Sequence, residues 1–198
     1  MENFRTFVAL PVKVGSRFLK ARAELIDSLK GERISWVDRS RFHVTLRFLG
    51  DTEERDVEAI GNSLREHVKL PPVTKLKFDR VGSFGPRKRP RVVWVGFEES
   101  SLFHNLKIDV DSALERVGIP PEEQPFRAHL TLGRVRSMRE LQEFYQIIEK
   151  MKDNFKEELS VESLVFYRSE LKSDGPVYTP LTKLGFSSQT PSPGSPFR

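Results

Sequence analysis

The stretch RFHVTLRFLG at residues 41–50 decides our interpretation of this chain, because it places a histidine and a threonine at alternate positions of a strand-like apolar run. Successive side chains of a strand point to opposite faces, so His43 and Thr45 share one face with Arg41 and Arg47. The apolar residues between them form the other face, which must pack on a core. The polar face is therefore open to a functional role.

A second stretch, FRAHLTLGRV at residues 126–135, repeats this pattern with His129, Thr131 and Arg127 on one face. A single histidine of this kind is commonly a core residue bonded to the backbone, or a surface residue. Repetition with the same threonine spacing favours a functional pair over two unrelated histidines.

The predicted elements around these two stretches follow one plan in both halves of the chain. Each half reads as strand, helix, strand, helix, strand, with its His-x-Thr pair on the middle strand, which predicts an internal duplication at about 4–84 and 91–171. Asp51 and Thr52 are candidate N-caps of the second helix. A last strand follows at about 177–186. The other predicted strands lie at 5–11, about 42–49, 73–84, 91–97, 128–135 and 159–171, and the predicted helices at 14–31, 51–68, 101–118 and 137–151.

This order of elements predicts a bilobal α+β fold. We expect two similar lobes, each an antiparallel sheet with helices, related by an approximate two-fold axis. The two His-x-Thr pairs would then converge on an active-site cleft between the lobes. Residues 1–186 form this single domain, and residues 187–198, rich in serine and proline, are expected to be a flexible tail.

The composition is that of a soluble globular protein, with 37% hydrophobic and 31% charged residues among 198. No apolar run approaches the roughly 20 residues that a membrane-spanning helix requires, and the first residues lack the features of a signal peptide. We therefore expect a cytoplasmic protein that does not bind membranes. The chain has no cysteine, which excludes disulfides, thiolate metal sites and cysteine nucleophiles.

The net charge of +5 gives modest support to an anionic partner such as nucleic acid. Basic residues gather in FGPRKRPR at residues 84–91, which reads as a loop between two strands. Such a loop is commonly a solvated turn, and its alternative role is to bind an RNA backbone. Arg87 in this loop is a candidate substrate contact.

Two imidazoles and two hydroxyls on facing strands suit in-line displacement at phosphorus. The reference pKa of histidine lies near 6.5, so one imidazole can act as a base while the other, protonated, acts as an acid. The hydroxyls and a guanidinium would hold the non-bridging oxygens, where negative charge builds up. This chemistry requires no metal and no cofactor.

Four segments, FHVTLRFLG, RVVWVGF, FRAHLTLGR and GPVYTPL, resemble in order the signatures of the two-histidine (2H) phosphoesterase superfamily. The likeness is to its RNA 2′,3′-cyclic phosphodiesterase members, also called 2′-5′ RNA ligases, and extends over residues 4–186. It implies a bilobal fold and metal-independent hydrolysis of a 2′,3′-cyclic phosphate at an RNA end to a 2′-phosphate. In some members it also implies reversible, ATP-independent 2′-5′ ligation.

Carried over residue by residue, the resemblance makes His43 and His129 the catalytic pair. Thr45 and Thr131 become the donors to the phosphoryl oxygens. The resemblance favours His129 as the base on water and His43 as the acid on the leaving oxygen. The sequence alone leaves that direction open.

Five further residues are candidates for substrate binding. Arg134 matches an arginine that contacts phosphate in similar proteins, yet strict alternation places it on the face opposite Thr131. Either the strand ends or bulges there, or Arg134 is structural. The other four candidates are Arg41, Arg127, Arg87 and Tyr178.

Three other aromatic residues, Phe48, Phe84 and Trp94, would also suit stacking on a terminal base. For Phe48 and Trp94, which lie on regular strands, a place in the core is favoured. Ala128 stands where the family usually has proline, which removes a backbone restriction but no reacting group.

Two alternative functions remain open from the sequence. In one, the protein binds RNA without catalysis and its His-x-Thr pairs only hydrogen-bond phosphate. In the other, it is a related phosphodiesterase acting on another cyclic phosphate or on a 2′-5′ linked oligonucleotide. A histidine metal site is disfavoured, because His43 and His129 have no obvious third ligand at metal spacing. We expect a monomer whose partner is RNA with a 2′,3′-cyclic phosphate end.

Overall fold

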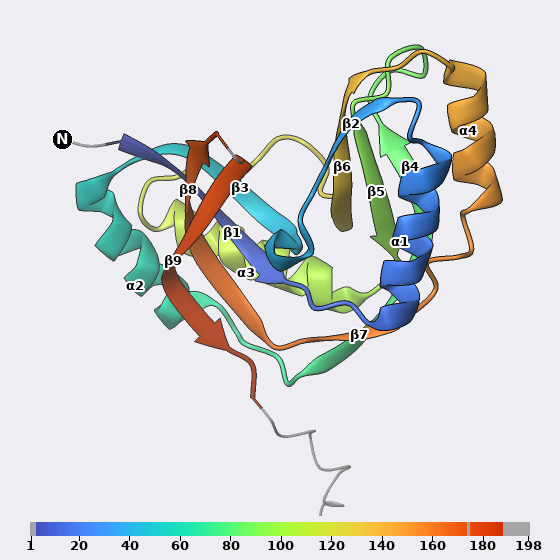
Figure 1. The fold of residues 1–198 in the computed structure, drawn as a ribbon. Helices are drawn as coiled ribbons and strands as arrows, with labels where there is room; N and C mark the ends of the chain where they lie inside the picture. Colours follow the sequence, from blue (N-terminus) through green and yellow to red (C-terminus); the bar gives the residue numbers. More distant parts are fainter. Residues whose placement is uncertain (1–2, 174, 188–198) are drawn as a thin grey trace, which may run out of the picture.

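The structure, a computed structural model, describes residues 3–173 and 175–187 as two antiparallel sheets with flanking helices (Figure 1). The strands are β1 (Asn3–Pro11), β2 (Arg33–Trp36), β3 (His43–Glu53), β4 (Thr74–Phe84), β5 (Val92–Phe97), β6 (His129–Ser137), β7 (Glu158–Val161), β8 (Ser163–Lys172) and β9 (Gly175–Gly185). The first lobe has the strand order β3-β1-β8-β9, and the second has β2-β6-β5-β4-β7. The fold is therefore α+β and bilobal, as predicted.

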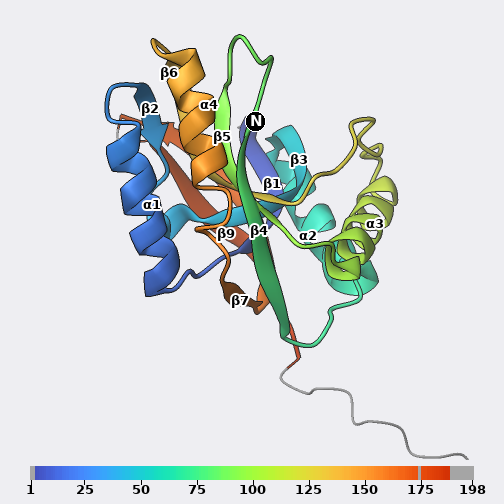
Figure 2. The ribbon, with the colours of Figure 1, turned by 90° about the vertical axis from the view of Figure 1, so that its right-hand side faces the viewer.

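The helices divide between the two lobes. They are α1 (Ser16–Ser28), α2 (Val57–His67), α3 (Ser101–Glu115) and α4 (Leu141–Lys150), with 3-10 turns η1 (Arg39–Arg41) and η2 (Glu54–Asp56) on either side of β3. Helices α1 and α4 lie beside the second sheet, and α2 and α3 beside the first (Figures 1 and 2). Along the described chain, none of the helices is long and apolar enough to cross a membrane.

The two halves of the chain exchange strands and helices between the lobes. Strand β8, from the second half, pairs with β1, and β4, from the first half, pairs with β5. Helix α1 packs on β4, where the rings of Phe18 and Phe78 lie 4.7 Å apart, and α3 contacts β3. Each lobe therefore contains segments of both halves, and neither half of the sequence forms a lobe by itself.

The second predicted helix begins later than its sequence suggests. Strand β3 continues to Glu53, and Asp51 and Thr52 pair with β1 instead of capping a helix. The Thr52 hydroxyl hydrogen-bonds the hydroxyl of Thr6 at 2.6 Å. The prediction of caps at these two residues is wrong, because pairing with a neighbouring strand outweighs a local capping signal.

The predicted strand at 159–171 is two strands, β7 and β8, which belong to different sheets. Glu162 separates them, so the chain crosses there from the second lobe to the first. The short edge strand β2, which pairs with β6, does not stand out in the sequence pattern. The other predicted strands and helices agree with the structure apart from their ends. The predicted tail lies outside the described residues, except for Ser187.

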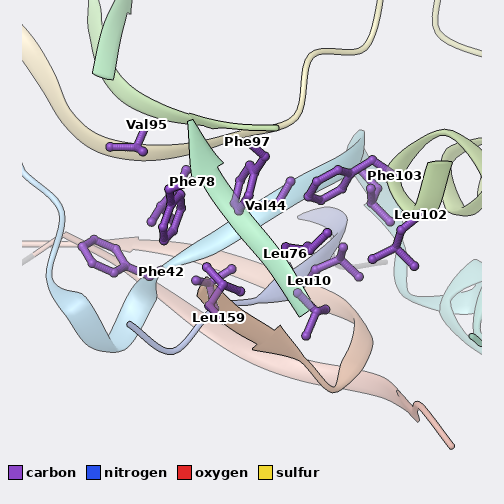
Figure 3. Close-up of a cluster of buried hydrophobic side chains, with 14 of the residues drawn as sticks. Leu10, Phe42, Val44, Leu76, Phe78, Val95, Phe97, Leu102, Phe103 and Leu159 are labelled. Carbon is purple, nitrogen blue, oxygen red and sulfur yellow. The ribbon is translucent and has the colours of Figure 1, made fainter. Parts of the chain in front are cut away.

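A continuous cluster of buried apolar side chains runs through both lobes (Figure 3). Phe42 and Val44, which flank His43, are 3% and 0% exposed. Leu130, which lies between the residues of the second pair, is also fully buried. The core therefore holds each His-x-Thr strand by its apolar face, and the polar face of each strand is turned away from it.

Candidate active site

The two histidines occupy equivalent places, each at the first position of its strand. The Nδ1 atom of His43 lies 2.8 Å from the carbonyl oxygen of Arg41, and Nδ1 of His129 lies 2.7 Å from the carbonyl oxygen of Arg127. A carbonyl oxygen only accepts, so in each ring Nδ1 carries the proton and donates it. The Nε2 atom of each imidazole is thereby left to exchange a proton with a substrate.

The two histidines are electrostatic neighbours although they belong to different lobes. Burial lowers the pKa of His43, and the charges of Arg134 and His129 lower it further. The hydrogen bond to the Arg41 carbonyl raises this pKa but does not offset the other effects. Burial likewise lowers the pKa of His129, and Arg134 adds to that effect. Strands β3 and β6 are in contact. The site therefore lies at the junction of the lobes, with Arg134 acting on both rings.

Aromatic rings hold each imidazole from the side. The ring of Tyr178 meets His43 edge-on, at 5.2 Å between centroids and 90° between planes, and Phe7 lies 5.1 Å from the same imidazole. In the second lobe, Phe84 meets His129 at 4.8 Å and 88°. These contacts limit rotation of the imidazoles and so fix where each Nε2 points.

Thr45 and Thr131 follow their histidines by two positions on the same face, and both are half-buried. Within the part of the chain that the structure describes, neither hydroxyl has a hydrogen-bond partner. Both are therefore available to donate to a bound oxygen.

In the same part of the chain, no three histidine, aspartate or glutamate side chains gather as a metal site would require.

A β-bulge in each motif strand changes which residues face the site. In β6, Thr131 pairs with Trp94 and Gly133 with Val93, so that Leu132 has no partner. The extra residue reverses the alternation and brings Arg134 to the face of His129. The sequence-based alternative of a bulge at this place is thus confirmed.

The same bulge occurs in β3, where Thr45 pairs with Ala9 and Arg47 with Val8. It turns Arg47, which alternation had placed beside His43, into the protein interior. It also brings Phe48 to the face of His43, where its side chain is 58% exposed. The predictions of a site-facing Arg47 and a core Phe48 are both wrong, for the same reason.

The remaining substrate-binding candidates lie in different surroundings. Arg41 donates from Nη1 to the carbonyl of Pro176, at 3.1 Å, and Arg127 has an exposed side chain. Arg87 places its guanidinium 5.2 Å from the ring centre of Tyr145 in α4 and accepts that phenol's hydrogen bond at its carbonyl, at 3.0 Å. The described contacts of Arg87 are thus with α4 and not with the histidines.

Sequence reasoning missed the buried ionic network that surrounds Arg47. This side chain is 7% exposed, and its Nη1 lies 3.6 Å from Asp111 and 3.7 Å from Glu122. Lys107, 10% exposed, bonds the same Asp111 at 2.6 Å, and Arg47 also donates to the carbonyl of Pro120. The network joins β3 to α3 and to the loop that leads into β6. Lys107 and Asp111 are an i,i+4 pair on α3, but Arg47 and the loop residues lie too far from them in the sequence for a local pattern to join them.

This arrangement defines a class of enzyme: a two-histidine phosphoesterase, with one His-x-Thr pair from each of two related sheets. The sequence profile described as LigT like Phosphoesterase matches residues 8–94 and 98–178, and each matched segment contains one of the pairs. The chain belongs to this LigT-like phosphoesterase family.

Curated relatives and solved structures extend the likeness over nearly the whole chain. The RNA 2′,3′-cyclic phosphodiesterase of Archaeoglobus fulgidus is 32% identical over 178 residues, covering 89% of this chain and 97% of the relative. The protein of the same name from Thermotoga maritima is 30% identical over 184 residues, covering 92% and 95%.

Among solved structures, TT0787 of Thermus thermophilus has a TM-score of 0.72 at 25% identity, covering 94% of this chain and 100% of that chain. Escherichia coli LigT complexed with ATP has a TM-score of 0.66 at 20% identity, covering 94% and 99%. The second likeness is one of fold.

Proposed function

We propose that this protein hydrolyses 2′,3′-cyclic phosphates at RNA ends to 2′-phosphates without a metal ion. The observation that carries the proposal is the pair of imidazoles at the lobe junction, each with its Nδ1 proton held by a backbone carbonyl. A threonine hydroxyl without a described protein partner accompanies each imidazole. The curated relatives that share this chain's length carry the name of this activity.

In the proposed reaction, Nε2 of neutral His129 takes a proton from water as its oxygen attacks phosphorus. The bond from phosphorus to the 3′ oxygen breaks, and protonated His43 gives that oxygen its proton. The products are a 3′ hydroxyl and a 2′-phosphate. Thr45 and Thr131 donate to the non-bridging oxygens, and Arg134 stabilises the added negative charge there.

The same groups run the proposed ligation. When a 5′ hydroxyl replaces water as the nucleophile, its oxygen attacks phosphorus and the bond from phosphorus to the 3′ oxygen breaks. The product is a 2′-5′ phosphodiester, and the reaction needs no ATP. In cleavage of that linkage the two histidines exchange roles, because each proton returns along its own path. We assign substrate binding to Arg134, Arg127, Arg41 and Tyr178, and contacts with longer RNA to Arg87.

The test is incubation of the protein with a short RNA that ends in a 2′,3′-cyclic phosphate, in the presence of excess chelator. We expect a terminal phosphate that phosphatase removes, since phosphatase acts on a monoester and not on the cyclic phosphate. We also expect the 2′ isomer alone, whereas chemical opening of the cyclic phosphate in alkali gives both the 2′ and the 3′ isomer. Activity lost in chelator and restored by a divalent cation would contradict the metal-independent mechanism. Tight RNA binding without any product would favour the RNA-binding alternative.

A further inference from the structure

A cavity of about 570 Å³ opens beside His43, on the side of the first lobe. Its walls come from η1, from the ends of β1 and β3, and from the hairpin of β8 and β9. This volume falls within the range of pockets that hold small ligands. His43 is itself part of the wall, so a ligand bound at the imidazole extends directly into the cavity.

The cavity is cationic. Arg41 and Lys172 both line it, and none of the described residues of its wall is acidic. Lys172 is exposed and makes no ion pair within residues 3–173 and 175–187. Burial raises the pKa of Tyr167 and of Tyr178, so both phenols keep their protons and can donate. The wall therefore offers positive charge and neutral donors, which suit a phosphate group.

The backbone of the hairpin holds the Arg41 guanidinium in place. The Pro176 carbonyl accepts a hydrogen bond from Nη1 at 3.1 Å. Gly175 has a φ of +106°, and a Cβ there would lie 2.6 Å from the same Nη1. The conformation requires a glycine, and a Cβ there would push the guanidinium away from its bond to Pro176. With one of its five N–H groups used in this way, Arg41 keeps four donors for a ligand.

The second lobe offers no equivalent of this arrangement among the described residues. Arg127 is the counterpart of Arg41, since each lies two positions before its histidine and gives its carbonyl to that ring. The side chain of Arg127 is exposed, and the cavity beside His43 does not include it. The phosphate next to the reacting one is thus expected beside His43 and not beside His129.

We propose that this cavity binds the phosphodiester that joins the reacting nucleotide to its 5′ neighbour, through Arg41 and Lys172. The inference rests on the proposed function, in which His43 serves the 3′ oxygen of the terminal ribose and the cyclic phosphate lies between the two histidines. The nucleotide directly before the reacting one then lies against the first lobe, and the contacts assigned to Arg87 in the second lobe concern only nucleotides farther along the RNA. The preferred substrate is an oligonucleotide end and not a cyclic mononucleotide.

The test compares two substrates with the same reacting group: adenosine 2′,3′-cyclic phosphate, and the dinucleotide ApA that ends in a 2′,3′-cyclic phosphate. For the unchanged protein we expect kcat/KM to be roughly tenfold higher for the dinucleotide, because only the dinucleotide has a phosphodiester that can accept charge-assisted hydrogen bonds from Arg41 and Lys172. Lys172→Gln and Arg41→Gln should each reduce this ratio severalfold, mainly through KM. Lys183→Gln is the matched control, because this exposed lysine of β9 does not line the cavity, and it should leave the ratio unchanged.

Each outcome separates this inference from the proposed function. Hydrolysis of neither substrate would contradict the proposed function itself. Hydrolysis of both with equal kcat/KM would overturn the inference alone, as would a ratio that Lys172→Gln leaves unchanged. Because Arg41→Gln also removes the bond to Pro176, Lys172→Gln is the deciding variant: its side chain has no described partner, so a lowered ratio there cannot come from a loosened hairpin.

Discussion

Strands β3 and β6 carry the same machinery in the same geometry. Each begins with a histidine whose Nδ1 donates to the carbonyl two residues before it. Each carries its threonine two positions later, and each has a bulge after that threonine. The parts that we propose to transfer protons and to hold the phosphoryl oxygens are therefore duplicated almost without change.

The two strands differ directly after the bulge. At the fourth position from the histidine, β3 has the buried Arg47 and β6 has Gly133. At the fifth position, β3 presents the exposed Phe48 to the site and β6 presents Arg134. One lobe thus adds an aromatic surface and the other adds a positive charge.

This difference matches the asymmetry of the reaction. A cyclic phosphate is attacked from one side and loses an oxygen on the other, and the ribose occupies only one of these sides. In the proposed reaction, proton transfer needs an imidazole on both sides, which agrees with the equivalence of the histidines. Recognition of the substrate needs different groups on each side, which agrees with the difference between the residues beyond the bulges. Substitutions at equivalent positions of β3 and β6 test whether the two strands share proton transfer and differ in substrate recognition.

The largest effect is expected from the shared part. His43→Ala and His129→Ala should each lower kcat by about 10²–10⁴-fold, because each removes one of two coupled proton transfers. The double variant should lose far less than the product of the two single losses, since the residues act as a unit. Hydrolysis of a short RNA ending in a 2′,3′-cyclic phosphate measures this. Near-normal turnover in either single variant would mean that the two histidines do not both take part in proton transfer.

The next largest effect concerns stability at the fourth position. Arg47→Met leaves Asp111 and Glu122 with one fewer cation in a mostly buried network. Removing one partner of a buried pair costs about 3–5 kcal/mol. Because both carboxylates are partly exposed, the expected loss of unfolding free energy is about 3 kcal/mol. Urea unfolding measures it.

The matched variant in the second lobe is Gly133→Ala. Its new Cβ would lie 2.7 Å from Ile34 Cγ2 and 2.9 Å from Trp36 Cε3, an overpacking that should cost about 1–2 kcal/mol. If Arg47→Met proved as stable as the unchanged protein, the network would not be what fixes the loop before β6 on the first lobe.

The sequence was sufficient for the features that depend on local periodicity. Alternation placed His43 and Thr45 on a polar face, and repetition of the pattern pointed to a joint site with His129. The core residues beside them followed from the same alternation. The predicted faces of these residues are confirmed, because a strand with one buried face has its register set by its own apolar residues.

The sequence was not sufficient for features that depend on distant partners. Each bulge is defined by the register of a neighbouring strand, so alternation placed Arg47, Phe48 and Arg134 on the wrong faces. The exchange of strands between lobes is equally nonlocal, and so is the break at Glu162. Partners of Arg47 lie on α3 and on the loop before β6, where no sequence pattern links them to it.

A smaller effect is expected from the two threonines. Thr45→Val and Thr131→Val each remove one donor to a phosphoryl oxygen while keeping the shape of the side chain. We expect each to lower kcat/KM about tenfold, or about 1.4 kcal/mol, less than loss of a histidine. Equal losses would support equivalent roles in the two lobes. A loss confined to one threonine would show that only one lobe holds the phosphoryl oxygens.

The finest test uses pH to separate the two residues at the fifth position. The Arg134 charge lowers the pKa of both His43 and His129, beyond the effect of burial. The profile of kcat/KM against pH should be bell-shaped, with its low-pH limb set by the imidazole that must be neutral and its high-pH limb set by the one that must be protonated. With both pKa values below about 6.5, the maximum should lie below that pH.

Arg134→Gln removes the charge and should raise both histidine pKa values, so both limbs should move to higher pH. Phe48→Leu changes the matched position without changing any charge, so its limbs should remain where they are even if KM rises. We therefore expect the pH profile to be displaced in Arg134→Gln and to stay in place in Phe48→Leu. A profile that stays in place in Arg134→Gln would mean that this guanidinium does not act on the imidazoles, and that the lobes do not differ in charge at the site.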